Sequence, residues 1–294
     1  EAWAASDIGS KMISIVIALE ERLAEETMKK TAHLKKKYGR NFREMIDIVH
    51  PNDIEGEVEG VKGANINWAT RIFVEKILER GESMEEYLLI TCDCDLRPHP
   101  KYLSAVMYKY LTVPNPQRKF YASAVHTFHN NLFRVPLLIR VASSSLTLAI
   151  MQEWVVAKSI RETFSSYIVN LKTVHEVGYW DPQVGIDDTT FYYNALVRFA
   201  GDFRGEEVYV PTYNDAVENE TRSKSYKSLY KQQLRWGWGA IIFPMTFAGI
   251  YKNPEIPLEK KIKIAASVLD MRLVFRTVVY TITFGLPILS LLSP

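Results

Sequence analysis

The sequence is poor in several features that define common protein classes. Only two of its 294 residues are cysteines, which is too few for a disulfide framework or a four-thiolate zinc site. Cys92 and Cys94 are separated by one residue, too close for an ordinary disulfide, and we expect both to be small buried side chains of a strand. Repeats and low-complexity linkers are lacking, and 47% apolar residues exclude a disordered or fibrous protein.

Net charge is also small. The chain carries 36 Lys and Arg against 34 Asp and Glu, a net +2, and we expect no nucleic-acid partner. The charges are nevertheless unevenly distributed. Residues 222–294 contain 11 Lys and Arg but 3 Asp and Glu, a net +8, which leaves −6 for residues 1–221. An acidic body joined to a basic, increasingly apolar end is unusual for a simple soluble enzyme.

A long uncharged run occurs at the end of the chain. Residues 277–293 carry no charge and follow Arg272 and Arg276. A membrane-spanning helix needs about 20 apolar residues, so we expect residues 271–294 to begin a transmembrane helix, with a buried terminal helix as the alternative. The positive-inside rule then places residues 1–221 in the cytoplasm as the body of an integral membrane protein. Because the chain begins without Met or a signal peptide, we expect a fragment of a longer protein.

Apolar runs and turn residues predict alternating strands and helices. Short β-branched runs at 12–19, 44–49 and 87–92 predict strands, with helices between them at 24–38 and 64–80. This order is typical of an α/β fold with a parallel, doubly wound sheet that binds ligands at the carboxyl ends of its strands. Further strands are expected at 119–126, 165–171 and 207–210, and further helices at 101–110, 133–156, 191–199 and 225–238.

Two acidic residues directly follow the third predicted strand. If the strand alternation continues, Asp93 and Asp95 lie on the same side of the sheet edge. Two carboxylates there can hold a hard divalent cation together with substrate phosphates. The alternative is a solvated loop, because Asp-x-Asp also occurs often by chance.

A second acidic pair, Asp187 and Asp188, precedes a predicted helix. Aspartate is favoured at helix starts, so capping of the helix explains the pair. Two carboxylates in a cleft could instead supply one ionised general base. Spacing alone favours capping.

The most unusual segment is Gln232-Gln233-Leu234-Arg235-Trp236, which lies in a basic, aromatic predicted helix. Its amides, guanidinium and indole are suited to binding a diphosphate and stacking against a sugar or base. A basic interfacial helix with aromatic anchors is the alternative, and the two interpretations are compatible. We therefore expect this helix and further interfacial helices in the part of the chain between 222 and 270.

Together, these three motifs resemble those of family 2 glycosyltransferases in order and spacing, most closely the membrane-bound, cellulose-synthase-like branch. The Val-Lys-Gly-Ala-Asn segment at 61–65 is similar to the family's Gly/Lys/Asn loop. The resemblance implies a GT-A fold, a Rossmann-like, mixed but mainly parallel sheet flanked by helices. It also implies inverting transfer of a sugar from a nucleotide-diphosphate sugar, with UDP expected, to a hydroxyl of a carbohydrate or lipid-linked acceptor. Polysaccharide or glycolipid synthesis at the membrane is the expected role.

The resemblance further implies roles for the acidic residues. Asp93 matches the first Asp of the family's DxD motif, which contacts the nucleotide sugar, and Asp95 matches its metal ligand. The two would hold a divalent cation, magnesium or manganese. Asp188 matches the base that deprotonates the acceptor hydroxyl. Asp187 stands where Glu is usual, which keeps the charge with a shorter reach.

Donor-binding roles are implied for the other motif residues. Gln232, Gln233, Arg235 and Trp236 resemble the residues that hold the donor diphosphate and line the acceptor channel. Lys62 is expected to reach the donor phosphates.

One family feature has no counterpart here, namely a first strand that ends in Pro-x-Tyr/Asn-x-Glu. Residues 13–19 with Glu20 and Glu21 look instead like the family's second strand, where an Asp pair contacts the base. Either glutamate would substitute for that pair. The first strand, and with it part of the donor site, would then be missing from this fragment.

Two other classes of function remain open. A nucleotidyltransferase, or another metal-dependent transferase that binds nucleotides, would use Asp93 and Asp95 but would not need the Gln-Gln-x-Arg-Trp helix. A non-catalytic, membrane-associated binding module would use the basic segment only as an anchor.

Overall fold

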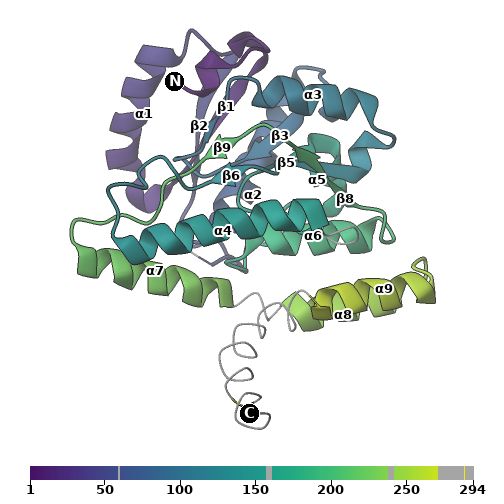
Figure 1. Cartoon of the computed structure of the whole chain (residues 1–294). Coiled ribbons are helices and arrows are strands. Elements are labelled where there is room, and N and C mark those ends of the chain that lie inside the picture. Colours follow the sequence, from purple (N-terminus) through teal and green to yellow (C-terminus); the bar gives the residue numbers. More distant parts are fainter. Residues whose placement is uncertain (59, 157–160, 238–241, 271–287, 289–294) are drawn as a thin grey trace.

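The protein has an α/β fold in which helices surround a central group of strands (Figure 1). The computed structural model describes residues 1–58, 60–156, 161–237, 242–270 and 288. The longer strands lie where the apolar runs predict them. The strands are β1 (Ser14–Glu20), β2 (Glu44–His50), β3 (Leu88–Thr91), β4 (Arg97–Pro98), β5 (Lys119–Ser123), β6 (His126–Thr127), β7 (Tyr167–Asn170), β8 (Arg204–Val208) and β9 (Thr212–Tyr213).

The longer helices are also close to their predicted positions, and α8 and α9 lie within 222–270, where further helices are expected; α5 was not predicted. The short helix α5 follows β7 directly because the Asn170 side chain caps it by accepting a hydrogen bond from the Lys172 N–H over 3.0 Å. The helices are α1 (Ala24–Tyr38), α2 (Lys62–Glu79), α3 (Tyr102–Thr112), α4 (Leu137–Val156), α5 (Leu171–Val177), α6 (Asp187–Arg198), α7 (Arg222–Gly237), α8 (Ile242–Lys252) and α9 (Leu258–Leu269).

Hydrogen bonds divide the described strands into three sheets. β1 and β2 pair in parallel, and β4, β9 and β6 form a small sheet. The remaining sheet has the order β3-β7-β5-β8, in which β7 is antiparallel to both neighbours and β5 is parallel to β8. The mixed α/β architecture is confirmed, but the expectation of one parallel, doubly wound sheet is wrong. Apolar periodicity reports which residues are buried, not which strands pair.

The two cysteines lie outside the strands. β3 ends at Thr91, so Cys92 and Cys94 belong to the segment that follows it. Cys92 is half-buried and Cys94 is exposed, and both are free thiols. The expectation that both are buried within a strand is therefore wrong.

Aromatic rings dominate the main core. Phe120 of β5 is fully buried, and its ring centroid lies 5.8–6.1 Å from those of Trp154, Tyr167, Tyr192 and Phe203. Such edge-on and tilted contacts stabilise the core beyond the burial of apolar area. The core therefore holds α4 and α6 against β5 and β7, which positions the start of α6.

Three further helices, α7, α8 and α9, lie beyond α4 and α6 as seen from the strands (Figure 1). Leu229 of α7 packs near Ile139 of α4, and α8 and α9 contribute Ile250 and Val268 to the main core. Among the helices of the described ranges, none has the length and apolar character needed to cross a bilayer. The predicted membrane segment at 271–294 lies outside the described residues, apart from residue 288.

Candidate active site

The start of α2 meets the segment that follows β3. Lys62 is the first residue of α2, and its Nζ donates a hydrogen bond to Asp93 Oδ1 over 2.8 Å. The same Nζ donates to the Ser165 carbonyl over 3.1 Å, and Thr91 Oγ1 donates to that carbonyl over 3.4 Å. Lys62 therefore fastens the end of β3 to the segment that precedes β7.

The first turn of α6 packs closely against the first turn of α2. A Cβ atom at Gly63 would lie 2.9 Å from the Asp181 carbonyl oxygen and 3.1 Å from Asp187 Cβ, so the approach depends on glycine. Asp187 is only 7% exposed. Thr163 Oγ1 donates to the backbone carbonyl of Asp188 over 2.5 Å. Lys62, at the start of α2, is thereby brought to the acidic pair.

The acidic pair lies at the start of α6. Ile186 occupies the N-cap position, and no side chain there caps the helix. Asp187 and Asp188 lie in the first turn, where the helix dipole favours a negative charge. Asp188 Oδ1 accepts a hydrogen bond from the Thr189 N–H over 2.7 Å. Asp188 therefore satisfies a main-chain donor of the first helical turn, although not from the N-cap position.

Burial and nearby charges govern the protonation of this group. Burial raises the pKa of Asp187 to about 6, with Lys62 opposing the rise and Asp188 adding to it. Burial also raises the pKa of Asp188, and Lys62 again opposes the rise. For Lys62, burial acts to lower the pKa, but the negative charges of Asp93, Asp187 and Asp188 outweigh it and raise the value. A raised carboxyl pKa is a property of general bases.

The third motif lies on α7. The positive charge of Arg235 acts to lower the pKa of Asp188, with less effect than burial, the Thr189 N–H or Lys62. Gln232 and Trp236, about one turn apart, are half-buried, whereas Gln233 and Arg235 are exposed. Arg235 is thus the residue of this motif that the structure connects to the acidic pair.

Asp95 has different partners from Asp93. Its Oδ1 accepts a hydrogen bond from Asn214 Nδ2 over 3.3 Å, and its Oδ2 accepts one from the Asp215 N–H over 2.9 Å. Because β3 ends at Thr91, strand alternation does not extend to either aspartate, and it is not a valid reason to place them on one side. The hydrogen bonds instead connect Asp95 to the segment between β9 and α7.

The oxygen atoms around Asp95 suit a hard divalent cation. The Asn214 amide that contacts Asp95 also has a buried Oδ1 without a hydrogen-bond partner, and such an atom invites a ligand. In the part of the chain that the structure describes, no three His, Cys, Asp or Glu side chains are grouped to bind a metal ion. Asp93 and Asp95 would therefore need further oxygens from a substrate, which is how magnesium is commonly held at phosphate sites.

Two adjacent asparagines outside the predicted motifs hold this segment in place. Asn131 is 5% exposed, and its side chain both donates to the Ala216 carbonyl over 2.8 Å and accepts from the Ala216 N–H over 2.7 Å. Asn130 Nδ2 donates to the carbonyls of Asp95 and Tyr213 over 3.1 and 3.3 Å. An Asn-Asn pair within an otherwise apolar and aromatic stretch is the sequence signal that could have indicated this role.

His126 is another site residue that sequence motifs do not include. It is 4% exposed; its Nδ1 lies 2.9 Å from Thr212 Oγ1, and its buried Nε2 has no partner. Burial lowers its pKa to about 4, although the Asp93 charge opposes this change. The ring is therefore neutral at pH 7 and keeps one unsatisfied nitrogen in a region that the Asp93 charge reaches.

Glu20 and Glu21 have local partners. Arg22 Nε lies 2.5 Å from Glu20 Oε2, and the Asn52 N–H donates to Glu21 Oε2 over 2.8 Å. β1 ends at Glu20, so both glutamates lie at the carboxyl end of this strand. Their contact with a nucleotide base stays a prediction.

Comparison with known proteins gives a family match over most of the chain. The sequence profile described as "Glycosyl transferase family group 2" matches residues 88–294. The chain has no significant match among curated proteins. One similar solved structure is glucosyl-3-phosphoglycerate synthase from Mycobacterium tuberculosis, in complex with phosphoglyceric acid. It is 14% identical with a TM-score of 0.37, over 81% of this chain and 83% of that chain, and a likeness at this level supports no inference about function.

Proposed function

The chain belongs to glycosyl transferase family group 2, and on this premise we propose that it transfers a sugar from a UDP-sugar to a hydroxyl acceptor with inversion at the anomeric carbon. One observation carries the proposal: motif residues far apart in the sequence meet at the starts of α2 and α6. Lys62 Nζ bonds to Asp93, and the close approach at Gly63 brings Asp187 to the same end of α2. The mixed α/β architecture supports a GT-A fold for this domain.

Asp188 is the proposed general base. Its carboxylate takes the proton of the acceptor hydroxyl while the acceptor oxygen forms a bond to the anomeric carbon. The bond from that carbon to the nucleoside diphosphate breaks on the opposite face, and the diphosphate leaves with the electron pair. Burial raises the pKa of Asp188 toward the operating pH, where a general base is most effective. Asp187 lies beside it and adds to the negative charge of the site.

The cations of the site are suited to the leaving diphosphate. Lys62 lies in the first turn of α2, where the helix N-terminus also favours anions. Together with Arg235, it would offset the negative charge that develops on the leaving group. The side chains of Gln232, Gln233 and Trp236 would supply amide donors and a stacking surface.

Magnesium or manganese is the proposed cofactor, with Asp93 and Asp95 as its ligands. When bound, the cation would neutralise diphosphate charge and so favour departure of the leaving group. Asp95 is already oriented by Asn214 and Asp215, and the unpartnered Asn214 oxygen is an additional candidate ligand.

We further propose that residues 1–221 act at the cytoplasmic face of a membrane. The net +8 of residues 222–294 and the −6 of the remainder support this orientation. Exposed Phe133 precedes α4 and exposed Leu137 begins it, next to basic α7, and apolar side chains beside a basic helix suit an anionic lipid surface. In this proposal, 222–270 is the interfacial segment and 271–294 begins a membrane helix. The acceptor is then a carbohydrate or a lipid-linked sugar of polysaccharide or glycolipid synthesis.

Product analysis with a panel of nucleotide sugars tests the proposal, using the chain in membranes with magnesium or manganese. The expected products are a nucleoside diphosphate and a glycosylated acceptor. Asp95→Ala should abolish their formation. Asp215→Ala is the matched control, because it removes an exposed side chain and keeps the N–H that bonds to Asp95. Release of pyrophosphate would indicate a nucleotidyltransferase, and failure to bind any nucleotide sugar would indicate a binding module.

A further inference from the structure

A groove lies beside α2, apart from the carboxylates of the proposed reaction. Its volume is about 390 Å³, within the range of about 300–1,000 Å³ of small-molecule pockets and sufficient for a mono- or disaccharide. It is lined by residues of α2, of the turn that follows α5, and of α6. The residues that matter for recognition are Asn67, Trp68, Arg71, Tyr179, Trp180 and Asn194.

The lining combines ring surfaces with planar polar groups. Trp68 supplies a half-buried ring, whereas Tyr179 and Trp180 line the groove with only 6% and 2% of their surfaces exposed. A pyranose has apolar C–H faces, which match aromatic rings, and a rim of hydroxyls that each donate and accept hydrogen bonds, which match amide and guanidinium groups. Glu57 and Asp181 also line the groove, so both signs of charge are present beside the Arg71 cation. This balance favours an uncharged, polyhydroxylated ligand over an anion.

The recognition groups are held in place by one another. The Arg71 guanidinium lies 4.4 Å from the centroid of the Tyr179 ring, and its Nε donates to Asn67 Oδ1 over 3.1 Å. The Tyr179 hydroxyl lies 2.8 Å from His175 Nδ1. Ring, guanidinium and amide are therefore fixed before a ligand arrives, which reduces the entropic cost of binding.

The backbone of the groove is equally constrained. Tyr179 has φ +68°, in the left-handed region that a residue with a side chain rarely adopts; such strain is concentrated at ligand sites. The Val58 N–H donates to the Pro182 carbonyl over 3.2 Å, and Gln183 Nε2 donates to the Gly56 carbonyl over 2.9 Å. These bonds tie the segment after β2 to the turn after α5.

We propose that this groove is a non-catalytic carbohydrate-binding site. Asp181 lines the groove, and its carbonyl packs against Gly63, which on the same side approaches Asp187. The backbone from 181 to 187 is therefore a wall shared by the groove and the acidic pair. Two ligands share the chemistry that the groove would recognise: a part of the acceptor chain distant from the reacting hydroxyl, and a free sugar.

Binding is tested without turnover, in the Asp188→Asn chain. Disaccharides and tetrasaccharides of β-linked glucose and of β-linked N-acetylglucosamine are titrated while tryptophan fluorescence is followed. A saturable change is expected for at least one of them. Arg71→Ala should weaken that affinity about three- to tenfold, the effect of losing one polar contact. Asn194→Ala, at an exposed position on α6, should weaken it without a folding defect.

Lys76→Ala is the matched control, because it removes an exposed cation from the same helix outside the groove. It should leave the affinity unchanged. The proposal is overturned if no saccharide of the panel binds saturably, or if Lys76→Ala weakens binding as much as Arg71→Ala.

Steady-state kinetics of the unaltered catalytic site distinguish the two sources. If the acceptor chain occupies the groove, Arg71→Ala raises KM for long acceptors, but not for short ones, and leaves kcat unchanged. If a free sugar occupies it, a disaccharide changes donor turnover in the unaltered chain and not in Arg71→Ala. Because binding is measured in a variant deficient in turnover, failure of the proposed enzymatic function would leave the binding result intact.

Discussion

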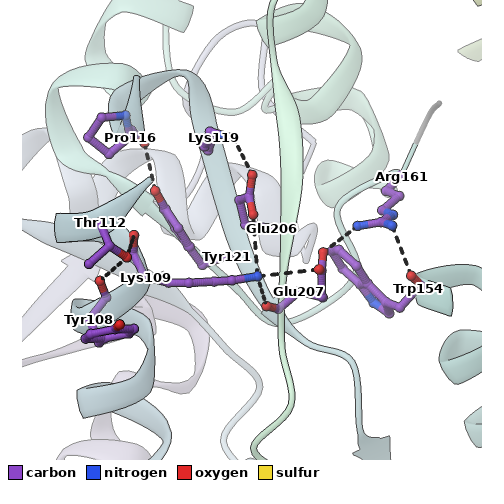
Figure 2. Close-up of polar contacts among 10 residues, drawn as sticks. All are labelled: Tyr108, Lys109, Thr112, Pro116, Lys119, Tyr121, Trp154, Arg161, Glu206 and Glu207. Carbon is purple, nitrogen blue, oxygen red and sulfur yellow. Dashed lines mark hydrogen bonds and ion pairs between the residues drawn. The ribbon is translucent and has the colours of Figure 1, made fainter. Parts of the chain in front are cut away.

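Two groups of charged side chains in this protein differ in their ratio of cations to carboxylates, and the pKa values of their acids shift in opposite directions. In the first, the β8 cluster, Lys109, Lys119 and Arg161 surround Glu206 and Glu207 (Figure 2). Arg161 Nη1 lies 2.6 Å from Glu207 Oε2, and Lys109 Nζ lies 3.4 Å from Glu206 Oε2. Although burial acts to raise the pKa of Glu207, its hydrogen bonds and the two neighbouring cations lower it.

The second group, the site cluster, consists of Lys62, Asp93, Asp187 and Asp188, one cation for three carboxylates, with a weaker influence of the exposed Arg235 on Asp188. Here burial prevails and the pKa values of Asp187 and Asp188 rise. In these two clusters, the ratio of cations to carboxylates accompanies the direction in which the pKa of the acid shifts. With excess cations, the acid stays ionised and holds the fold together. With excess carboxylates, it can bind and release a proton near neutral pH.

The largest effect is expected for Asp188→Asn, which removes the proposed base and keeps the shape of the side chain. The rate of sugar transfer should fall by about 10²–10⁴-fold, the usual contribution of general base catalysis. Measurement of kcat with saturating donor checks this. Asp202→Asn, at an exposed position before β8, is the control and should have no effect. A rate for Asp188→Asn equal to that of the unaltered chain would exclude Asp188 as the base.

Lys62→Met should have the next largest effect, because it removes the cation that bonds to Asp93 and thereby raises the negative charge of the site cluster. Transfer should fall by about 100-fold, as for loss of one preorganised electrostatic contact. The pKa values of Asp187 and Asp188 should rise further, since Lys62 lowers both. The acid limb of the pH–rate profile should therefore move to higher pH. An unshifted profile would contradict this account of the cluster, and Lys76→Met is the control.

Glu207→Gln tests the β8 cluster and should affect stability but not chemistry. Arg161 and Lys109 each lose a half-buried carboxylate partner, so the free energy of unfolding should fall by about 1–2 kcal/mol. Denaturant unfolding measures this change. Glu259→Gln breaks an exposed ion pair with Lys263 and should leave stability unaltered. If Glu207→Gln lowered kcat in fully folded protein, the distinction between the two clusters would fail.

The smallest effect is expected for the stability of Asp187→Asn, with a sign opposite to that of Glu207→Gln. The pKa of Asp187 is about 6 in the folded protein against the usual 3.8, so between these values the folded state retains a proton that the unfolded state has lost. Stability of the unaltered chain therefore falls as the pH rises from about 4 to about 6. Asparagine removes this loss. The full shift is worth about 3 kcal/mol, but asparagine also loses the attraction to Lys62, so the variant should be more stable at pH 7 by about 1 kcal/mol. The free energies of unfolding of the variant and the unaltered chain should converge near pH 4. A difference that persists at that pH would contradict the raised pKa of Asp187.

Much of the fold around the site could be predicted because periodic apolar residues report burial directly. The helix predicted at 24–38 matches α1, and the strand predicted at 44–49 matches β2 with one more residue. Pairing could not be predicted in this way. The residues of β7 are all buried, and this pattern contains no information that both of its neighbours run antiparallel to it.

In the candidate site, too, motif residues could be predicted from the sequence, but their spatial neighbours could not. Asp93, Lys62 and the acidic pair could be recognised as motif residues, but the spacing around Asp187 could not reveal that it lies near the start of α2, because Lys62 is distant in sequence. Their approach depends on the absence of a side chain at Gly63. His126 and Asn131 escaped notice for a related reason, since their partners Thr212 and Ala216 are distant in sequence.

The β8 cluster has a consequence for solubility. β8 lies at one end of its sheet in the described chain, and the Val208 carbonyl accepts from the Ala124 N–H on the side of β5. Carbonyls alternate along a strand, so that of Glu207 points outward, and Lys109 Nζ donates to it. An end strand with free main-chain groups is a template for aggregation. By occupying this acceptor and surrounding it with charge, Lys109 removes one of the main-chain groups that a second chain would need to extend the sheet.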